Sequence, residues 1–295
     1  MTTREYYRHF LLKIQAIYQL SEATVIADMV FEQLAGIKRS DFIKDPAKPI
    51  STKIKEGLDQ ALAELLTHKP VQYVLGTCWF HHLKFKVNEA VLIPRPETEE
   101  LVSHLIEDYK NNIYRVNQPS TKISRDQLRI LDIGTGSGCI PVSLKKNLAG
   151  AEITAIDISD KALDIARENA ETHHVDIQFI ELDFLDESSW ETQPVFDIII
   201  SNPPYIPFAE KDKLDKNVTD FEPHRALFVP DKDPLLFYGK IARFGKTHLA
   251  ENGRIYLEAH ADYTHDVAVV LKTYYADVKV IKDMQGRDRM IIAGY

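Results

Sequence analysis

A glycine-rich turn in the middle of the chain restricts the fold more than any other feature of the sequence. Residues 129–133 are apolar apart from Arg129 and Asp132, as expected of a buried strand. In the next five residues every second one is glycine, and apolar residues then recur at helical spacing. A strand that passes through a glycine turn directly into a helix predicts an α/β domain with parallel strands.

Strands and helices alternate along the rest of the chain. Besides residues 129–133, strands are predicted at residues 153–157, 177–182, 196–200, 254–258, 279–282 and 290–293. A tight connection at residues 285–288 makes the last two an antiparallel pair. Residues 111–127 are polar and without a pattern, which is typical of a surface loop.

The part of the chain before these strands has a different pattern. Residues 1–75 show the spacing of a small bundle of helices. Residues 76–95 then alternate as a short hairpin around His81 and His82. Three regions are therefore expected: a helical domain at 1–75, a hairpin linker at 76–95 and a sheet domain at 96–295.

The composition argues against several classes of function. With a net charge of −8, the protein is not expected to hold nucleic acid mainly through phosphate contacts. Cys78 and Cys139 form no C-x-x-C pair, so neither a disulfide framework nor a zinc site is indicated. The histidine pairs at 81–82 and 173–174 lack a carboxylate or cysteine at ligand spacing, so no metal is expected. Without a signal core or a long apolar run, the protein is expected in the cytoplasm and not in a membrane.

A second group of residues follows the strand at 196–200. Asn202, Pro203, Pro204 and Tyr205 stand at its carboxyl end, the edge where open α/β sheets bind ligands. A proline has no N–H and holds the residue before it extended, so the Pro203 carbonyl and the Asn202 side chain can both present acceptors. Two acceptors beside an aromatic ring suit a flat NH2 group. The alternative is a rigid turn with no role in binding.

The glycine turn indicates a nucleoside ligand. Glycines let the backbone approach a ligand, and Asp157, at the end of the next strand, can accept hydrogen bonds from both ribose hydroxyls. Asp132 precedes the turn, where a carboxylate would repel a diphosphate but attract the ammonium and sulfonium of S-adenosyl-L-methionine. Asp183 and Phe184, which end the third strand, can meet the adenine amino group and ring face. The candidate cofactor-binding residues are Gly134, Thr135, Gly136, Ser137, Gly138, Asp157, Asp183, Phe184 and Asn202.

Together these residues resemble a known family. The turn at 132–138, combined with Asn-Pro-Pro-Tyr at 202–205, is similar to class I S-adenosylmethionine-dependent amino methyltransferases. The Ile-Pro-Arg-Pro-Glu-Thr-Glu block at 93–99, the helical N-terminus and Phe-Glu-Pro at 221–223 narrow the resemblance to the HemK family. That family methylates the glutamine of peptide chain release factors.

The resemblance covers nearly the whole chain and implies both fold and activity. The implied fold is α/β: a seven-stranded, mostly parallel, Rossmann-like methyltransferase sheet with a reversed last strand, plus a small N-terminal helical bundle. The implied reaction is methylation of a release factor glutamine at the side-chain nitrogen N5, with S-adenosyl-L-methionine as cofactor. Residues 1–75 would then dock the protein substrate.

The Asn-Pro-Pro-Tyr residues suggest how an amide is methylated. An amide nitrogen is a poor nucleophile, because its lone pair is conjugated with the carbonyl. We expect the Asn202 oxygen and the Pro203 carbonyl to accept its two N–H bonds, which localises the lone pair and aims it at the methyl group. Tyr205 is expected to pack on the planar amide. Catalysis is assigned to Asn202, Pro203 and Tyr205, and substrate binding to the same residues together with Pro204.

The stretch at 206–232 is long for a connection, so it is a candidate functional loop in which Glu222, Pro223 and Arg225 cover the substrate. A passive surface loop is the alternative. Two other functions stay open. An N6-adenine or N2-guanine nucleic-acid methyltransferase would use the same acceptors on a flipped base, although the acidic charge counts against it. The other is a protein that binds S-adenosyl-L-methionine without turnover.

Overall fold

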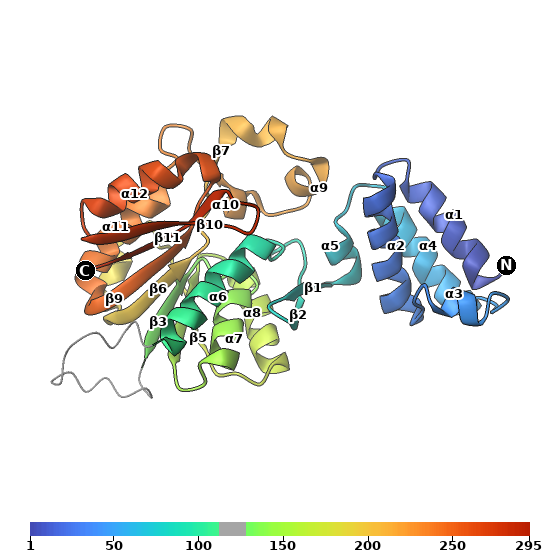
Figure 1. Cartoon of the computed structure of the whole chain (residues 1–295), viewed down its shortest axis with the longest axis horizontal. Helices are drawn as coiled ribbons and strands as arrows, with labels where there is room; N and C mark the ends of the chain where they lie inside the picture. Colours follow the sequence, from blue (N-terminus) through green and yellow to red (C-terminus); the bar gives the residue numbers. More distant parts are fainter. Residues whose placement is uncertain (112–127) are drawn as a thin grey trace. The chain divides into compact units, whose positions relative to one another are not determined.

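The computed structural model describes residues 1–111 and 128–295 (Figure 1). The surface loop expected at 111–127 lies, from residue 112 on, outside the described residues. None of the helices that the structure describes has the length and apolar character that a membrane span requires.

The described residues form two compact units. The smaller unit comprises Met1–Thr77 and Leu214–Phe221, and the larger comprises Cys78–Lys213 and Glu222–Tyr295. The smaller unit has one hydrophobic core of its own, and the larger unit has two.

The smaller unit is a bundle of helices, as the sequence predicts. The helices are α1 (Thr3–Ile14), α2 (Leu20–Ala35), α3 (Asp41–Lys44), α4 (Thr52–Leu65), α5 (Val71–Leu75) and α9 (Lys216–Thr219). Ser51 caps α4 by accepting a hydrogen bond from the Ile54 N–H, and Gly36 ends α2 in the left-handed conformation that glycine favours. In the core, the Phe31 ring meets the rings of Tyr7 and Phe10 edge-on, at centroid distances of 5.0 and 5.5 Å.

A seven-stranded sheet forms the centre of the larger unit. In spatial order its strands are β10 (Asp277–Lys282), β11 (Asp288–Gly294), β9 (Leu249–Glu258), β6 (Phe196–Ser201), β3 (Arg129–Ile133), β4 (Glu152–Asp157) and β5 (Gln178–Glu181). Strand β11 is antiparallel to both neighbours, and the other pairs are parallel. This order confirms the predicted fold class, including the reversal of the last strand in the chain.

Helices cover both faces of this sheet (Figure 1). On one face pack α6 (Pro96–Lys110), α7 (Cys139–Asn147) and α8 (Asp160–Thr172), and on the other α11 (Leu236–His248) and α12 (Thr264–Lys272). Because successive residues of a strand point to opposite faces, Ile198 and Ile200 belong to the first core and Ile199 to the second. The all-apolar run of β6 is thus explained by burial on both sides.

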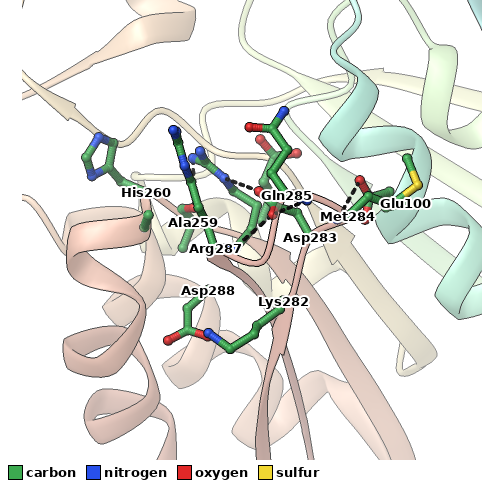
Figure 2. Close-up of polar contacts among 12 residues, drawn as sticks. Glu100, Ala259, His260, Lys282, Asp283, Met284, Gln285, Arg287 and Asp288 are labelled. Atoms are coloured by element: carbon green, nitrogen blue, oxygen red, sulfur yellow. Dashed lines mark hydrogen bonds and ion pairs between the residues drawn. The ribbon is translucent and has the colours of Figure 1, made fainter.

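One hairpin, β1–β2, is separate from the sheet, and another, β10–β11, forms one edge of it. Strands β1 (Thr77–Phe80) and β2 (Leu83–Lys86) are joined by His81 and His82, and Phe80 and Phe85 are buried in the core beneath α6. The β10–β11 turn lies next to α6, where the Met284 N–H donates to the Glu100 carboxylate at 3.0 Å (Figure 2).

The long stretch after β6 contains short elements. Strands β7 (Ile206–Pro207) and β8 (Phe228–Val229) pair in parallel, with the 3₁₀ helix η4 (Phe208–Lys213) and α10 (His224–Leu227) between them. Further 3₁₀ helices are η3 (Glu187–Thr192) and η5 (Ala261–Tyr263). The β7–β8 pairing brings the two ends of the stretch together.

Candidate active site

A pocket of about 470 Å³ opens where strands β3, β4 and β6 end. Ile133 and Asp157 are the last residues of β3 and β4, and Asn202 follows β6 directly. The volume is in the range of small-molecule sites, and the position is the carboxyl edge that the sequence predicts.

Most of the predicted site residues meet in this pocket. Those that line it are Gly134, Gly136, Asp157, Asp183, Phe184, Asn202, Pro203 and Pro204. In the described chain, four others are not part of the lining. Thr135 and Ser137 are buried within the turn, Gly138 is the N-cap of α7, and Tyr205 contacts Glu258.

The backbone of the glycine turn shows why glycine is needed there. Gly134, Gly136 and Gly138 have φ values of +74°, +54° and +76°, a region that other residues rarely adopt. At Gly138 a Cβ would also lie 3.0 Å from the Cβ of Ala166, so α7 and α8 approach closely only without a side chain. The turn is tied to β4, because the Gly136 N–H donates to Asp157 Oδ2 at 2.9 Å.

Two carboxyl groups lie at this turn, one half-buried and one fully buried. Asp157 also accepts the Ser159 N–H at 2.9 Å, and burial raises its pKa against these hydrogen bonds. Asp132 is fully buried, and within the described residues neither of its oxygens has a hydrogen-bond partner. Burial raises the pKa of Asp132 to about 7. A buried carboxyl without a partner is a place where a cation would be stabilised.

Phe184 is held rigidly at the pocket wall. Its ring lies 5.4 Å from the rings of both Trp190 and Phe244, and the Trp190 indole N–H donates to the Phe184 carbonyl at 3.0 Å. Asp183, beside it, accepts the Leu185 N–H at 3.0 Å. The ring and the carboxylate are thus fixed next to each other, as a site for a flat base with an amino group requires.

The side chain of Asn202 is held by a chain of hydrogen bonds. Asn202 Nδ2 donates to Thr98 Oγ1 at 3.0 Å, and Thr98 Oγ1 donates to Glu258 Oε2 at 2.6 Å. The Tyr205 hydroxyl donates to the other oxygen of Glu258 at 3.4 Å. Because Nδ2 is engaged with Thr98, Oδ1 is the atom of the Asn202 amide that can accept a hydrogen bond from a ligand.

The comparisons with known proteins agree with this geometry. Residues 120–221 match the methyltransferase small domain family, and residues 7–76 match the PrmC N-terminal domain family. The release factor glutamine methyltransferase of Flavobacterium psychrophilum is 41% identical over 293 residues, covering 99% of this chain and 98% of its own. The enzyme of that name from Bacteroides thetaiotaomicron is 37% identical and covers 95% of each chain. The chain belongs to the release factor glutamine methyltransferase family.

A solved structure supports the fold of this methyltransferase. The hMettl16 catalytic domain, in complex with a MAT2A 3′UTR hairpin, superposes with a TM-score of 0.52 at 15% identity, over 81% of this chain and 80% of that one. At this identity the likeness concerns the fold alone.

The cover of the methyltransferase pocket was only partly predicted. Pro223, Arg225 and Ala226 line it, and so do Ala90, Val91 and Leu92, for which the sequence suggested no role. The buried carboxylate of Glu222 joins the two segments, because it accepts the Ile93 N–H at 3.0 Å and pairs with the Arg95 guanidinium. Two features of the sequence could have indicated this contact: Arg95 lies between two prolines, and Glu222 directly precedes a third.

Thr98 and Glu258 were not predicted as site residues. Thr98 stands in the first turn of α6, and Glu258 is the last residue of β9. A lone acid at the end of a buried strand, on the same sheet edge as Asn202, was a usable signal for Glu258. The threonine carried no signal of its own.

The histidine pairs make ordinary contacts. A ring nitrogen of His173 lies 2.9 Å from the Lys84 carbonyl, and one of His81 lies 3.4 Å from the Ser103 hydroxyl. In residues 1–111 and 128–295, no three histidine, cysteine or acidic side chains gather as a metal site would require.

Proposed function

We propose that this chain methylates the side-chain amide nitrogen N5 of a glutamine in a peptide chain release factor, with S-adenosyl-L-methionine as methyl donor. The observation that supports this most is the orientation of Asn202, whose Nδ2 is held by Thr98. Asn202 and Pro203 both line the pocket, so Asn202 Oδ1 and the Pro203 carbonyl are the two acceptors proposed for the N–H bonds of a primary amide.

The residues present fit the proposed cofactor. Gly134, Gly136, Asp157, Asp183 and Phe184 all line the pocket. In this proposal the glycines let the backbone approach the cofactor, and Asp157 accepts hydrogen bonds from its ribose hydroxyls. Asp183 and Phe184 bind the adenine amino group and ring. When bound, the cofactor supplies an electrophilic methyl group on a positively charged sulfur.

Other predicted cofactor residues act through the backbone in this proposal. Thr135, Ser137 and Gly138 shape the turn. Asp132 lies one residue before the pocket-lining Ile133, so its charge acts across the turn without contact. A cation in the pocket would compensate this buried carboxylate.

The chain's own groups activate the amide. Asn202 Oδ1 and the Pro203 carbonyl accept its two N–H bonds, and this draws the lone pair out of conjugation and orients it. Both acceptors become more effective as the nitrogen gains positive charge in the transition state, so they stabilise that state selectively. Pro204 fixes the backbone of Pro203. Tyr205, next to Glu258, supports this edge, and its contact with the substrate amide stays a prediction.

The same proposal covers the partner and the place of reaction. The smaller unit carries no pocket-lining residue in the described chain, and docking of the release factor is its proposed role. A release factor is a cytoplasmic protein, so the enzyme would act there, without a metal and without holding nucleic acid itself.

One experiment tests the reaction and its alternatives. The purified chain is incubated with labelled S-adenosyl-L-methionine and, separately, with a release factor, the same factor lacking its target glutamine, DNA and RNA. We expect one methyl group, mapped by mass spectrometry to that glutamine, and none on the glutamine-free factor. Label on nucleic acid alone would overturn the substrate, and cofactor binding without transfer to any substrate would overturn the reaction.

A further inference from the structure

The hydrogen-bond chain behind Asn202 consists of groups that the reaction itself does not use. The Thr98 side chain connects Asn202 to Glu258, with distances of 3.0 and 2.6 Å on its two sides. Thr98 and Glu258 are 3% and 1% exposed, so water does not compete for the hydrogen bond between them. Within the chain described, neither residue lines the pocket.

The number of protons shared by Asn202, Thr98 and Glu258 decides which way the side-chain amide of Asn202 faces. An ionised carboxylate only accepts hydrogen bonds, so the single hydroxyl proton of Thr98 goes to Glu258. The Thr98 oxygen then has only lone pairs to offer Asn202, and the NH2 end of the amide is the end that fits them. The opposite rotamer would place two acceptors against each other in a buried site, which costs about 1–3 kcal/mol.

We propose that Glu258, acting through Thr98, is a positioning residue that holds Asn202 with its oxygen toward the substrate amide. The inference rests on the proposed function and deepens it, because it assigns the orientation of the acceptor to two residues that do not touch the substrate.

The orientation of Asn202 therefore depends on the protonation state of Glu258. A protonated Glu258 donates a hydrogen bond, which frees the Thr98 hydroxyl to donate to Asn202 Oδ1 and removes the preference between the rotamers. Burial raises the pKa of Glu258 to about 7, so both forms are accessible near neutral pH.

Charged and titratable groups surround Glu258 on every side. Glu97 of α6 raises its pKa, and Arg289 of β11 lowers it. The Tyr205 hydroxyl donates to its carboxylate, and the Tyr238 hydroxyl of α11 donates to its backbone oxygen at 3.1 Å. The tyrosine hydroxyls stay neutral across this range, because burial raises their pKa values further above the ordinary value.

The β10–β11 turn keeps Arg289 beside this group. Arg289 donates to the Ala259 carbonyl at 3.4 Å, and its Nε lies 3.9 Å from the buried carboxylate of Asp283. Asp283 in turn accepts the N–H groups of Gln285 and Arg287, each at 2.9 Å (Figure 2). The cation that favours ionised Glu258 is thus fixed by the fold of the hairpin.

The first test compares substitutions at Thr98. T98V removes the hydroxyl at nearly constant volume, and T98S keeps it. We expect T98V to lower kcat for release factor methylation about 10- to 100-fold, as misplacement of a catalytic group does, with the Kd of S-adenosyl-L-methionine within about threefold of wild type. T98S should restore kcat to within about threefold. T264V is the matched control, since Thr264, the first residue of α12, is also buried and donates to the backbone carbonyl of Ala261 in η5.

The second test is the pH profile of kcat at saturating cofactor and substrate. The wild type should lose activity as pH falls through about 7, and E258Q, which cannot ionise, should show no such acidic limb. T98V with wild-type kcat, T98S as slow as T98V, or a wild type without an acidic limb would each overturn the inference. If E258Q does not fold, the T98V and T98S pair decides. Failure of the wild type itself to methylate the release factor would instead refute the proposed function.

Discussion

The buried carboxylate of Glu222 accepts a hydrogen bond from the backbone N–H of Ile93 at 3.0 Å, although 129 positions separate the two residues. The same carboxylate pairs with the Arg95 guanidinium. The immediate neighbours of both partners, Leu92 and Pro223, line the pocket. One buried carboxylate therefore joins the two segments that cover the active site.

Glu222→Ala should loosen this cover. We expect the Kd of S-adenosyl-L-methionine to rise about 10-fold, which corresponds to about 1.4 kcal/mol. The free energy of unfolding should fall by about 1–3 kcal/mol, because the Ile93 N–H is left buried without its acceptor. Calorimetry and urea unfolding measure the two effects. Glu187→Ala is the control, since Glu187 pairs with Lys240 and Arg243 at the surface and such pairs contribute little. An equal loss of affinity in both variants would refute the joining role.

Asn202→Ala should separate catalysis from cofactor binding. Removal of the amide oxygen takes away an acceptor that acts mainly in the transition state, so kcat should fall about 10²- to 10³-fold. The Kd of the cofactor should stay within about threefold, because the glycine turn, Asp157 and Phe184 are untouched. Steady-state methylation and calorimetry test this. The control is Asn147→Ala, whose side chain bonds a backbone carbonyl on the surface of α7.

If cofactor binding collapsed together with kcat in Asn202→Ala, the residue would have a structural role and the proposed amide chemistry would lose its main support.

The sequence predicted those parts of the fold and site that depend on local geometry. The glycine turn could be placed because positive φ angles require glycine at Gly134, Gly136 and Gly138. Strand β6 and the edge after it could be placed because an apolar run that ends in two prolines has few other structures. Alternation of strands and helices then decided the fold class.

The sequence did not predict the contacts that connect distant elements. Thr98 lies 104 positions from Asn202 and 160 from Glu258. The three residues meet only because β6 and β9 are neighbouring strands and α6 packs against β9. Periodicity tells which face of an element is buried but not which side chains of two elements touch. Thr135 and Ser137 show the opposite case: their position in the motif predicts ligand contact, the structure buries both within the turn, and their part in binding stays a prediction.

The backbone conformation of the turn between β1 and β2 is unfavourable for the two histidines that occupy it. His81 and His82 have φ values of +48° and +63°, a region that glycine adopts without strain. His82→Gly should therefore raise the free energy of unfolding by about 0.5–1 kcal/mol, after allowing for the greater freedom of glycine in the unfolded chain. His265→Gly, within α12, should instead lower it by about 1 kcal/mol. Urea unfolding checks both, and destabilisation by His82→Gly would show that the histidine ring contributes more than the backbone strain costs.

Ionisation of Asp132 should lower the stability of the protein and raise its affinity for the cofactor as pH increases. Its pKa of about 7 in the folded protein lies well above the value of about 3.9 in an unfolded chain. Between these values the folded state binds more protons, so the contribution of Asp132 to stability is greatest below about pH 4 and is lost as pH rises toward 7. A cationic ligand favours the ionised form, and its affinity should therefore increase over the upper part of the same range.

We accordingly expect the Kd of S-adenosyl-L-methionine to fall up to about 10-fold between pH 6 and 8, with release of up to about half a proton per cofactor bound near pH 7. Calorimetry in buffers of different ionisation enthalpy measures both quantities. Asp132→Asn should bind about 10-fold more weakly at pH 8 and show neither effect. Asp197→Asn is the control, since Asp197 is also buried but accepts the Arg129 N–H at 2.8 Å, and it should keep the wild-type pH dependence. If Asp132→Asn retained that dependence, the buried carboxyl would not sense the charge of the cofactor, and the motif would serve the turn alone.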